Sequence, residues 1–520
     1  MMPAVHRQHH PHVYLWTGSE LGDRIDLGGD VIAMSYQRQL GQPAGSWSVT
    51  LQVRTHGTGT GAGLLRLPEL YRRDLLNKPI SLGIDYPGGW CFGLVDGVTH
   101  GVSADPAGAT LTLRGRDLGK ALVADNIVRA GLNLIGPEAP LYLDAVAAVL
   151  GADSPLYQSF LDILGPERDE LPDHAPTFLA AGIADILTWV VKNTPSLRIP
   201  VLKAAYGGQG EIGDYVDTSA AITSGYDDQV FNDDMATYQG SVWGFLQGVL
   251  DPDLYEIRLE TKPMGLTLDD ALRARLPPIP HVYLIVRPKP FDEEVCKRLP
   301  SGQDYGISWE KLRTFWHGRT HHEIGLDRVL GFQLGRDEGE VYNHYQAIPK
   351  HEIIGSPEGI SLGLSYPLTD LWSVRTHGLR AHTANLALVG GDVEAAKAAD
   401  PEYVGELASD VQAHRNRLLN WYWPNPWFEK GSINVLGADE YRVGDPVYLP
   451  WREGYLGAGL GMRYYCTGVA FSWSTGPAGV SHYTAQLTLE RGHNDALIDA
   501  ALEIVTTDAP PEAPDFLAKA

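Results

Sequence analysis

The sequence has few cysteines, no long apolar run and a shortage of basic residues. Its three cysteines, Cys91, Cys296 and Cys466, are too few and too scattered for a disulfide framework or a zinc site. We therefore expect buried thiols in a reducing compartment. No apolar run approaches about 18 residues, so we expect no membrane-spanning helix. The first residues, MMPAVHRQHHPHVYLW, lack the apolar core of a secretory signal, so none is expected.

The shortage of basic residues disfavours DNA binding through released counterions. The chain has 64 acidic and 41 basic residues and a net charge of -23, which repels phosphate backbones. Such repulsion still suits a channel through which DNA slides without being held. An acidic channel wall is therefore the expectation if the protein encloses one.

Motifs that would identify an enzyme are missing. The glycine-rich stretch HGTGTGAGLL (56–65) lacks the Gly-Lys-Ser/Thr ending of a phosphate-binding loop. No Gly-x-Ser-x-Gly elbow of a serine hydrolase occurs. Carboxylate pairs for glycoside hydrolysis exist among 64 acids, but no pair is singled out by its surroundings. We predict that the protein is not an enzyme, and we assign no catalytic, cofactor-binding or metal-binding residue and no cofactor.

The sequence instead carries many short strand patterns, separated by glycine and proline. Apolar and polar residues alternate in SWSVTLQVR (46–54) and ATLTLRG (109–115), which is typical of half-buried strands. Strand patterns return from SINVLG (432–437) to AQLTLERG (485–492). In between, APTFLAAGIADILTWVVKN (175–193) has the apolar spacing of a helix. With 520 residues, the chain exceeds the size of one hydrophobic core, so several domains are expected.

Two blocks at opposite ends of the chain resemble each other. The first block contains Gly97-Val98 followed by Pro106-Ala107-Gly108. The second block contains Gly468-Val469 followed, at the same spacing, by Pro477-Ala478-Gly479. Each block then enters a strand, Leu111-Thr112-Leu113 or Leu487-Thr488-Leu489, and ends at Gly115 or Gly492. Upstream, Lys78-Pro79-Ile80-Ser81-Leu82 parallels Asp445-Pro446-Val447-Tyr448-Leu449, and Val53-Arg54-Thr55-His56-Gly57 parallels Val374-Arg375-Thr376-His377-Gly378. A duplicated β module is the interpretation, although similar hairpins also arise from shared turn chemistry.

The repeat predicts an α+β, mainly β, fold with two tube-protein-like β-barrels. We divide the chain into a first barrel (1–118), a helix-rich α/β middle domain (119–290), a second barrel (291–384 and 431–495), a helical and aromatic insertion (385–430) and a flexible tail (496–520). Three such chains around an axis would present six similar barrels in a pseudo-sixfold ring.

Several stretches resemble the baseplate hub (tail hub) proteins of tailed phages and contractile injection systems, of the late-control-D and VgrG type. They are ATLTLRGRDLGKALVADNIV (109–128), VWGFLQGVLDPDLYEIRLE and HVYLIVRPKPF within 242–291, GRDEGEVYNHYQAIP (335–349), and YRVGDPVYLP through QLTLERG (441–492). They cover nearly the full length, as loose patterns.

The resemblance implies a homotrimeric structural protein at the tail tip of a virion, assembled in the host cytoplasm. Its ring would join a sixfold tail tube to a threefold spike and leave a lumen for DNA passage. Implied partners are the tail tube protein, a separate spike or tip protein, the tape measure protein and other baseplate proteins, with DNA passing through unbound. The alternative is a tail-associated glycan or peptidoglycan hydrolase, or a glycan-binding tip protein.

One aromatic cluster has the most unusual composition in the chain: Trp421, Tyr422, Trp423, Trp427 and Phe428. Tryptophans cluster in sugar-binding sites, and aromatic residues are also enriched at protein interfaces. The sequence favours a subunit interface here and leaves a glycan site open.

Overall fold

The fold is that of a computed structural model, and it is mainly β. The structure describes residues 9–17, 24–52, 70–84, 88–101, 109–124, 126–128, 180–182, 216–217, 229–231, 239–249, 252, 255–262, 281–288, 322–349, 368–386, 415, 418–419, 421–422, 425, 428–437, 439–452, 461–476 and 480–494. Among these described residues, none of the helices has the length and hydrophobicity that a membrane span requires.

The N-terminal part forms seven neighbouring strands of the main sheet, in the order β3-β4-β7-β6-β5-β1-β2. Their bounds are β1 (His12–Trp16), β2 (Arg24–Asp26), β3 (Val31–Gln39), β4 (Ser46–Gln52), β5 (Pro79–Gly83), β6 (Cys91–Gly101) and β7 (Thr110–Asp117). The alternation read in SWSVTLQ places Trp47, Val49 and Leu51 on the buried face, as a period of two requires.

The C-terminal part repeats the order of the first five of these strands. Here β16 pairs with β20, β20 with β23, β23 with β22, and β22 with β21. Their bounds are β16 (Val329–Gly335), β20 (Glu429–Leu436), β21 (Pro446–Leu449), β22 (Met462–Thr475) and β23 (Ser481–His493). We call β3-β4-β7-β6-β5 the first module and β16-β20-β23-β22-β21 the second module.

The register confirms two of the matched sequence blocks. Pro79 lies opposite Leu94, and Pro446 lies opposite Tyr465, each three residues before the matched Gly97 or Gly468. The pairing also shifts at the same place in both modules, just before the matched glycine. Such an irregularity is a β-bulge, a local feature that bends a strand. The two modules therefore share this β-bulge as well as their strand order.

Two other matches were wrong or misaligned. The register makes Leu113, opposite Val98, the counterpart of Leu487, opposite Val469, so the predicted alignment of this strand was two residues out. Gly115 consequently matches Leu489 rather than Gly492. Residues 53–57 lie outside the described residues, while 374–377 belong to helix α11 (Leu371–His377), which lies outside both modules.

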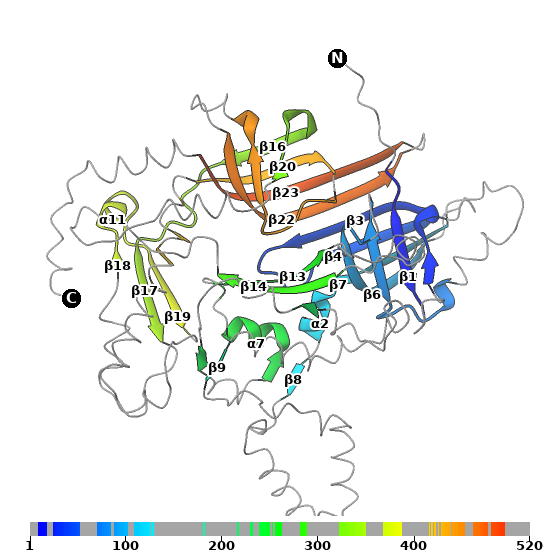
Figure 1. Cartoon of the computed structure of the whole chain (residues 1–520), viewed down its shortest axis with the longest axis horizontal. Helices are drawn as coiled ribbons and strands as arrows, with labels where there is room; N and C mark the ends of the chain where they lie inside the picture. The colour runs from blue at the N-terminus through cyan, green and yellow to red at the C-terminus, as the bar shows by residue number, and fades with distance from the viewer. Residues whose placement is uncertain are drawn as a thin grey trace, which may run out of the picture.

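The two modules join into one continuous sheet. Strand β22 of the second module pairs antiparallel with β3 of the first, from Gly468 opposite Gln39 to Ser474 opposite Ala33. Figure 1 shows the orange strands of the second module lying along the blue strands of the first. Buried side chains of both modules form one hydrophobic core. The large antiparallel sheet is therefore established, and its closure into two separate barrels stays a prediction.

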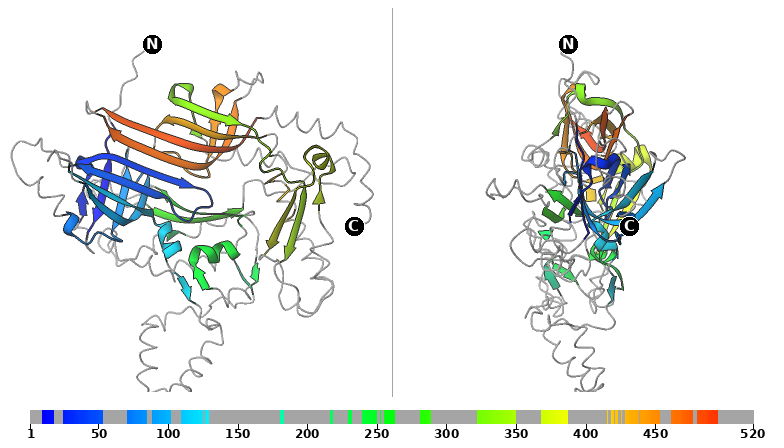
Figure 2. Two further views of the ribbon diagram at one scale, coloured as in Figure 1. Left: turned by 180° about the vertical axis from the view of Figure 1, so that it is seen from behind. Right: turned by 90° about the vertical axis from the view of Figure 1, so that its right-hand side faces the viewer.

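Smaller sheets flank the main one. Strands β17 (His344–Pro349), β18 (Leu368–Thr369) and β19 (Ala381–Leu386) form a sheet of their own. Figure 1 from the front and the left view of Figure 2 from behind both show this sheet standing beside the main one. The predicted division placed residues 291–384 in the second barrel, but β17 and β18 pair outside the main sheet. The second module is thus interrupted between β16 and β20, earlier than the predicted start at 385.

The helix-rich middle region is described in part. Helices α2 (Gly119–Ala124) and α7 (Val242–Val249) contact each other, and β13 (Tyr255–Lys262) pairs with β14 (His281–Pro288). The predicted helix at 175–193 and the predicted tail at 496–520 lie outside the described residues, apart from the short strand β9 (Ala180–Gly182).

A buried carboxyl group fastens the two modules together. Asp439, in the second module, accepts hydrogen bonds from the Ile84 backbone N–H (2.9 Å) and the Trp90 indole N–H (2.8 Å), both in the first module. The Tyr483 hydroxyl donates to the same carboxyl group. The Trp90 ring stacks on Phe471, with 5.4 Å between centroids. Asp439 is 1% exposed, so water cannot reach its carboxyl group. A carboxyl oxygen that loses one of these donors therefore stays without a hydrogen bond.

We predict that Trp90→Phe destabilises the protein more than Trp16→Phe. Both tryptophans are buried, so both changes lose similar packing. The Trp16 indole N–H has no acceptor among the described residues, whereas that of Trp90 serves Asp439. The expected additional loss is about 1–3 kcal/mol of unfolding free energy, measured by urea denaturation. Equal losses for the two variants would contradict this role of Asp439.

Candidate functional surface

On the face of the joined sheet opposite the core, three rows of paired residues carry no ionised side chain, and Glu490 of β23 follows beyond the last row on the same face. Residues paired across the strands form continuous rows on this face, which we call the uncharged face. Its rows are Ser48-Ser35-Ser472-Thr484, Ser46-Gln37-Ala470-Gln486-Asn434 and Gln39-Gly468-Thr488-Ser432. The rows run through both modules without interruption.

The uncharged face is hollowed. A depression of about 690 Å³ is lined by residues of β3, β4, β22, β23 and β20, together with Leu330 of β16. Its small hydroxyl and amide side chains offer neutral hydrogen-bonding groups. The rows contain no cation that would hold a phosphate and no carboxylate that would hold a metal ion or a basic peptide. The chemistry of this surface suits contact without strong binding.

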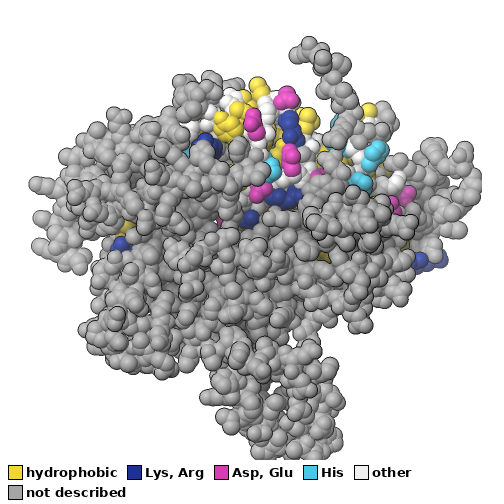
Figure 3. Space-filling view, in the orientation of Figure 1, with side chains coloured by type: hydrophobic (Ala, Val, Ile, Leu, Met, Phe, Trp, Pro, Cys, Tyr) yellow, Lys and Arg dark blue, Asp and Glu magenta, His cyan; other side chains and the backbone are white. Residues whose placement is uncertain are grey.

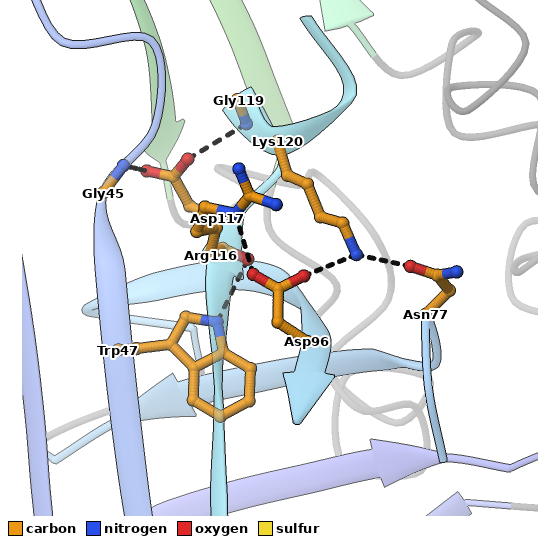
Figure 4. Close-up of polar contacts among 8 residues, drawn as sticks. All are labelled: Gly45, Trp47, Asn77, Asp96, Arg116, Asp117, Gly119 and Lys120. Atoms are coloured by element: carbon orange, nitrogen blue, oxygen red, sulfur yellow. Dashed lines mark hydrogen bonds and ion pairs between the residues drawn. The ribbon is translucent and has the colours of Figure 1, made fainter. Parts of the chain in front are cut away.

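Charged residues begin at the border of the uncharged face. Two rows continue onto β7 at Arg114, opposite Ser48, and at Arg116, opposite Ser46. Arg116 donates to Asp96 at 2.7 Å, and the Lys120 ammonium lies 2.5 Å from the same carboxylate (Figure 4). Partial burial acts to raise the pKa of Asp96, but hydrogen bonds from Arg116 and Lys120 outweigh it and lower that pKa. Arg116, Lys120 and Asp96 are thus paired with one another at this border.

A second buried carboxylate positions the strands beneath the uncharged face. Asp117 accepts from the backbone N–H groups of Gly45 (2.9 Å) and Gly119 (3.0 Å), as Figure 4 shows, and it pairs with Arg38. It also accepts from the Tyr36 hydroxyl at 3.2 Å. Burial, and then the negative charge of Asp117, raises the pKa of Tyr36 well above its usual value. This contact ties β3 to the end of β7.

The predicted aromatic cluster is buried inside the chain where it is described. Trp421 and Tyr422 are each 7% exposed and Phe428 is 5% exposed, while Trp423 and Trp427 lie outside the described residues. The Tyr422 ring packs against Tyr342 (4.8 Å between centroids) and against His382 of β19 (4.6 Å). These rings therefore connect the small β17–β19 sheet to the main sheet. The subunit-interface and glycan-binding roles stay predictions.

Arg491 fixes this cluster to β23. Its guanidinium carbon lies 3.4 Å from the centre of the Trp421 ring, and the same group donates to the Trp421 carbonyl oxygen. Burial lowers the pKa of Arg491 to about 10. Its backbone has a φ of 55°, which costs a residue other than glycine about 1–3 kcal/mol. The contact with Trp421 offsets that cost.

A smaller cavity of about 280 Å³ adjoins the cluster. Its lining combines Trp243, Tyr342, Trp421 and Tyr422 with Glu256, Glu340 and Glu490. Glu256 is already engaged, because Tyr465 and Arg258 donate to its carboxylate. The sequence associated clustered tryptophans with a glycan site, and Trp243 and Trp421 both line this cavity, but Glu256 beside them serves the internal packing.

The sequence interpretation missed the uncharged face. Its signal was available in the alternate positions of SWSVT (46–50), where Ser46, Ser48 and Thr50 are all short and polar. The same pattern recurs in FSWS (471–474) as Ser472 and Ser474. Only the pairing of β22 with β3 brings these residues together. In the described part of the chain, no group of three or more metal-ligating side chains converges.

We predict that Arg491→Lys lowers stability by about 1–2 kcal/mol. Lysine keeps the positive charge but lacks the flat guanidinium group that stacks on the Trp421 ring. It also cannot donate hydrogen bonds in the same geometry. Arg114→Lys, at an exposed position on β7, is the control and should change stability by less than about 0.5 kcal/mol. Thermal unfolding measures both. A loss no greater for Arg491→Lys than for the control would contradict the anchoring role.

Comparisons with known proteins give no family assignment. No family model matches the chain, and no curated protein matches it. Among solved structures, the tail protein from Neisseria meningitidis MC58 is similar, with 11% identity and a TM-score of 0.45, over 94% of this chain and 97% of that one.

Two further solved structures are similar at lower scores. The 43 kDa tail protein of prophage MuSo2 from Shewanella oneidensis has 10% identity and a TM-score of 0.39, over 92% of this chain and 98% of that one. A chain of the half-lidded Francisella PdpA-VgrG complex has 8% identity and a TM-score of 0.37, over 98% of this chain and 59% of that one. At these scores, similarity alone assigns no function to the chain.

Proposed function

We propose that this protein is the structural hub of a phage tail tip or baseplate. Three chains form a ring of six modules, which joins a sixfold tail tube to a threefold spike or tip. The uncharged face lines the lumen through which DNA passes. The protein acts in the virion by its geometry, without catalysis.

The observation that supports this proposal best is the continuity of the uncharged face across two duplicated modules. A duplicated module lets three chains present six similar units, which matches a sixfold partner on one side and a threefold partner on the other. The net charge of -23 makes a charge-free surface of this extent a distinctive feature of the molecule. It favours a passage that contacts its cargo and releases it.

The wall proposed here differs from the acidic one expected from composition. Repulsion by carboxylates and neutrality both prevent tight binding of phosphates, because each removes the counterion release that drives DNA binding. In the three rows of the uncharged face, the absence of charge is what prevents tight binding of phosphates. The tail tube protein, the spike or tip protein, the tape measure protein and other baseplate proteins are the proposed partners.

The first expected outcome concerns mass. The purified chain of 56.8 kDa should assemble into a trimer of about 170 kDa in light scattering, with a central hole in electron micrographs. A chain that stays monomeric at micromolar concentration and forms no ring would overturn the proposal. A stable dimer would overturn the trimeric arrangement as well.

The second expected outcome concerns charge on the uncharged face. The double variant Gln37→Lys, Gln486→Lys places cations on two exposed positions of one row. We expect it to keep the assembly but to bind a short DNA duplex that the wild type does not bind, with an affinity that falls steeply with salt. Fluorescence anisotropy at two salt concentrations measures this.

A control carries equal charge elsewhere. Leu76→Lys, Leu379→Lys alters two exposed positions away from the uncharged face. If both double variants bind DNA equally, the effect is one of net charge, and the uncharged face has no special relation to DNA.

A further inference from the structure

Two strand edges of the main sheet have no strand partner in the described part of the chain. Strand β16 pairs with β20 on one side only. Strand β6 pairs with β5 through Cys91–Leu94, but beyond its bulge, from Gly97 to Gly101, it pairs with β7 alone. Exposed edges carry rows of unpaired N–H and C=O groups, which natural proteins cover or pair.

The two edges are equivalents of the two strands that join within the chain. A constant difference in numbering relates residues 28–37 to residues 326–335, including the short 3-10 helix before each strand and the bulge that follows. Strand β16 is therefore the counterpart of β3. By the shared bulge and glycine, the outer half of β6 is the counterpart of the outer half of β22. In the chain, β22 and β3 pair directly.

We infer that β16 of one chain pairs antiparallel with the outer half of β6 of a second copy, repeating the β22–β3 junction between chains. The inference rests on the proposed ring and specifies how it closes. The observed register has Ala470 opposite Gln37 and Phe471 opposite Tyr36. When this register is applied to the equivalent positions of β6 and β16, Thr99 lies opposite Gly335 and His100 lies opposite Leu334.

The side chains at these edges fit such a contact. Leu326, Leu330 and Leu436 are 60%, 56% and 46% exposed at and beside the β16 edge. Figure 3 shows hydrophobic side chains together with charged ones over the top of the molecule, where Figure 1 places β16 and β20. The β6 edge offers Val98, Thr99 and His100 without a charged side chain between them. Apolar area exposed along an edge strand indicates a pairing partner.

The number of strands determines the dimensions of the closed ring. Each chain contributes the consecutive strands β16-β20-β23-β22-β3-β4-β7-β6, and three chains contribute three such segments. At about 4.8 Å between strands, the ring is about 115 Å around and about 37 Å across at the backbone. Strand tilt widens it further. Such a ring would place the uncharged face of all three chains on one continuous wall.

Cysteine cross-linking tests the register. The double variant Thr99→Cys, Gly335→Cys, made in a Cys296→Ser background, should form disulfide-linked dimers and trimers on oxidation. Gly335 accepts a side chain, because a Cβ there meets no atom within 4 Å. The remaining cysteines, Cys91 and Cys466, are buried. The matched control is Thr99→Cys, Gly331→Cys, since Gly331 is equally open but lies about 13 Å along the strand.

We expect at least about ten times more cross-linked product from the Gly335 pair than from the Gly331 pair, since a disulfide needs Cα atoms within about 7 Å. Equal or greater linkage through Gly331 would overturn the register. A protein that is trimeric by light scattering but links through neither pair would overturn the edge pairing and leave the proposed ring standing. A protein that is monomeric throughout would overturn both.

Hydrogen exchange of the wild-type chain provides a readout that does not depend on the variants. Backbone amides of 97–101 and of 329–335 should both exchange at least about tenfold more slowly in the trimer than in the dilute monomer. Protection of only one of the two segments, or of neither, would overturn the inference, because pairing protects both edges together.

Discussion

Backbone hydrogen bonds between β22 and β3 hold the two modules in one sheet, and both the core and the uncharged face follow from this pairing. It joins strands that are more than 400 residues apart in the sequence and turns two modules into one sheet. Side chains alternate across a sheet, so one register fixes both faces at once. Phe471 and Trp473 thereby enter the shared core, while Ser472 and Ser474 extend the uncharged face. A shift by one residue would exchange the two sets.

The two modules have kept their strand order and diverged in what they pack. At the junction inside the chain, Tyr36 stacks on Phe471 at 6.4 Å, and Asp439 is buried. At the equivalent edges, Leu334 takes the place of Tyr36 and His100 takes the place of Phe471. These side chains have less apolar area, and neither β16 nor β6 carries a buried carboxyl group. A contact that forms only on assembly must leave each chain soluble beforehand, and such edges satisfy that requirement better than a second aromatic stack.

Two carboxylates near the uncharged face are each held by cationic or backbone partners. Asp117 is surrounded by backbone donors and Arg38, and Asp96 is shared by Arg116 and Lys120. Pairing removes these charges from the field over the rows of serine, threonine and glutamine. The net charge of the whole chain therefore says little about this surface, and an acidic channel wall stays a prediction.

Local patterns were enough to predict the β character of the chain, the duplicated module and the equivalence of Pro79 with Pro446 and of Gly97 with Gly468. Alternation, prolines at strand starts and bulge glycines are all signals within a short stretch of sequence. It also indicated how few motifs for chemistry the chain contains. The pairing of β22 with β3, the hydrogen bonds of Trp90 and Tyr483 to Asp439, and the stacking of Arg491 on Trp421 could be found only from the folded chain. Those contacts form between residues far apart in the sequence, and the free energy that selects them comes from burying both partners together, which no local pattern records.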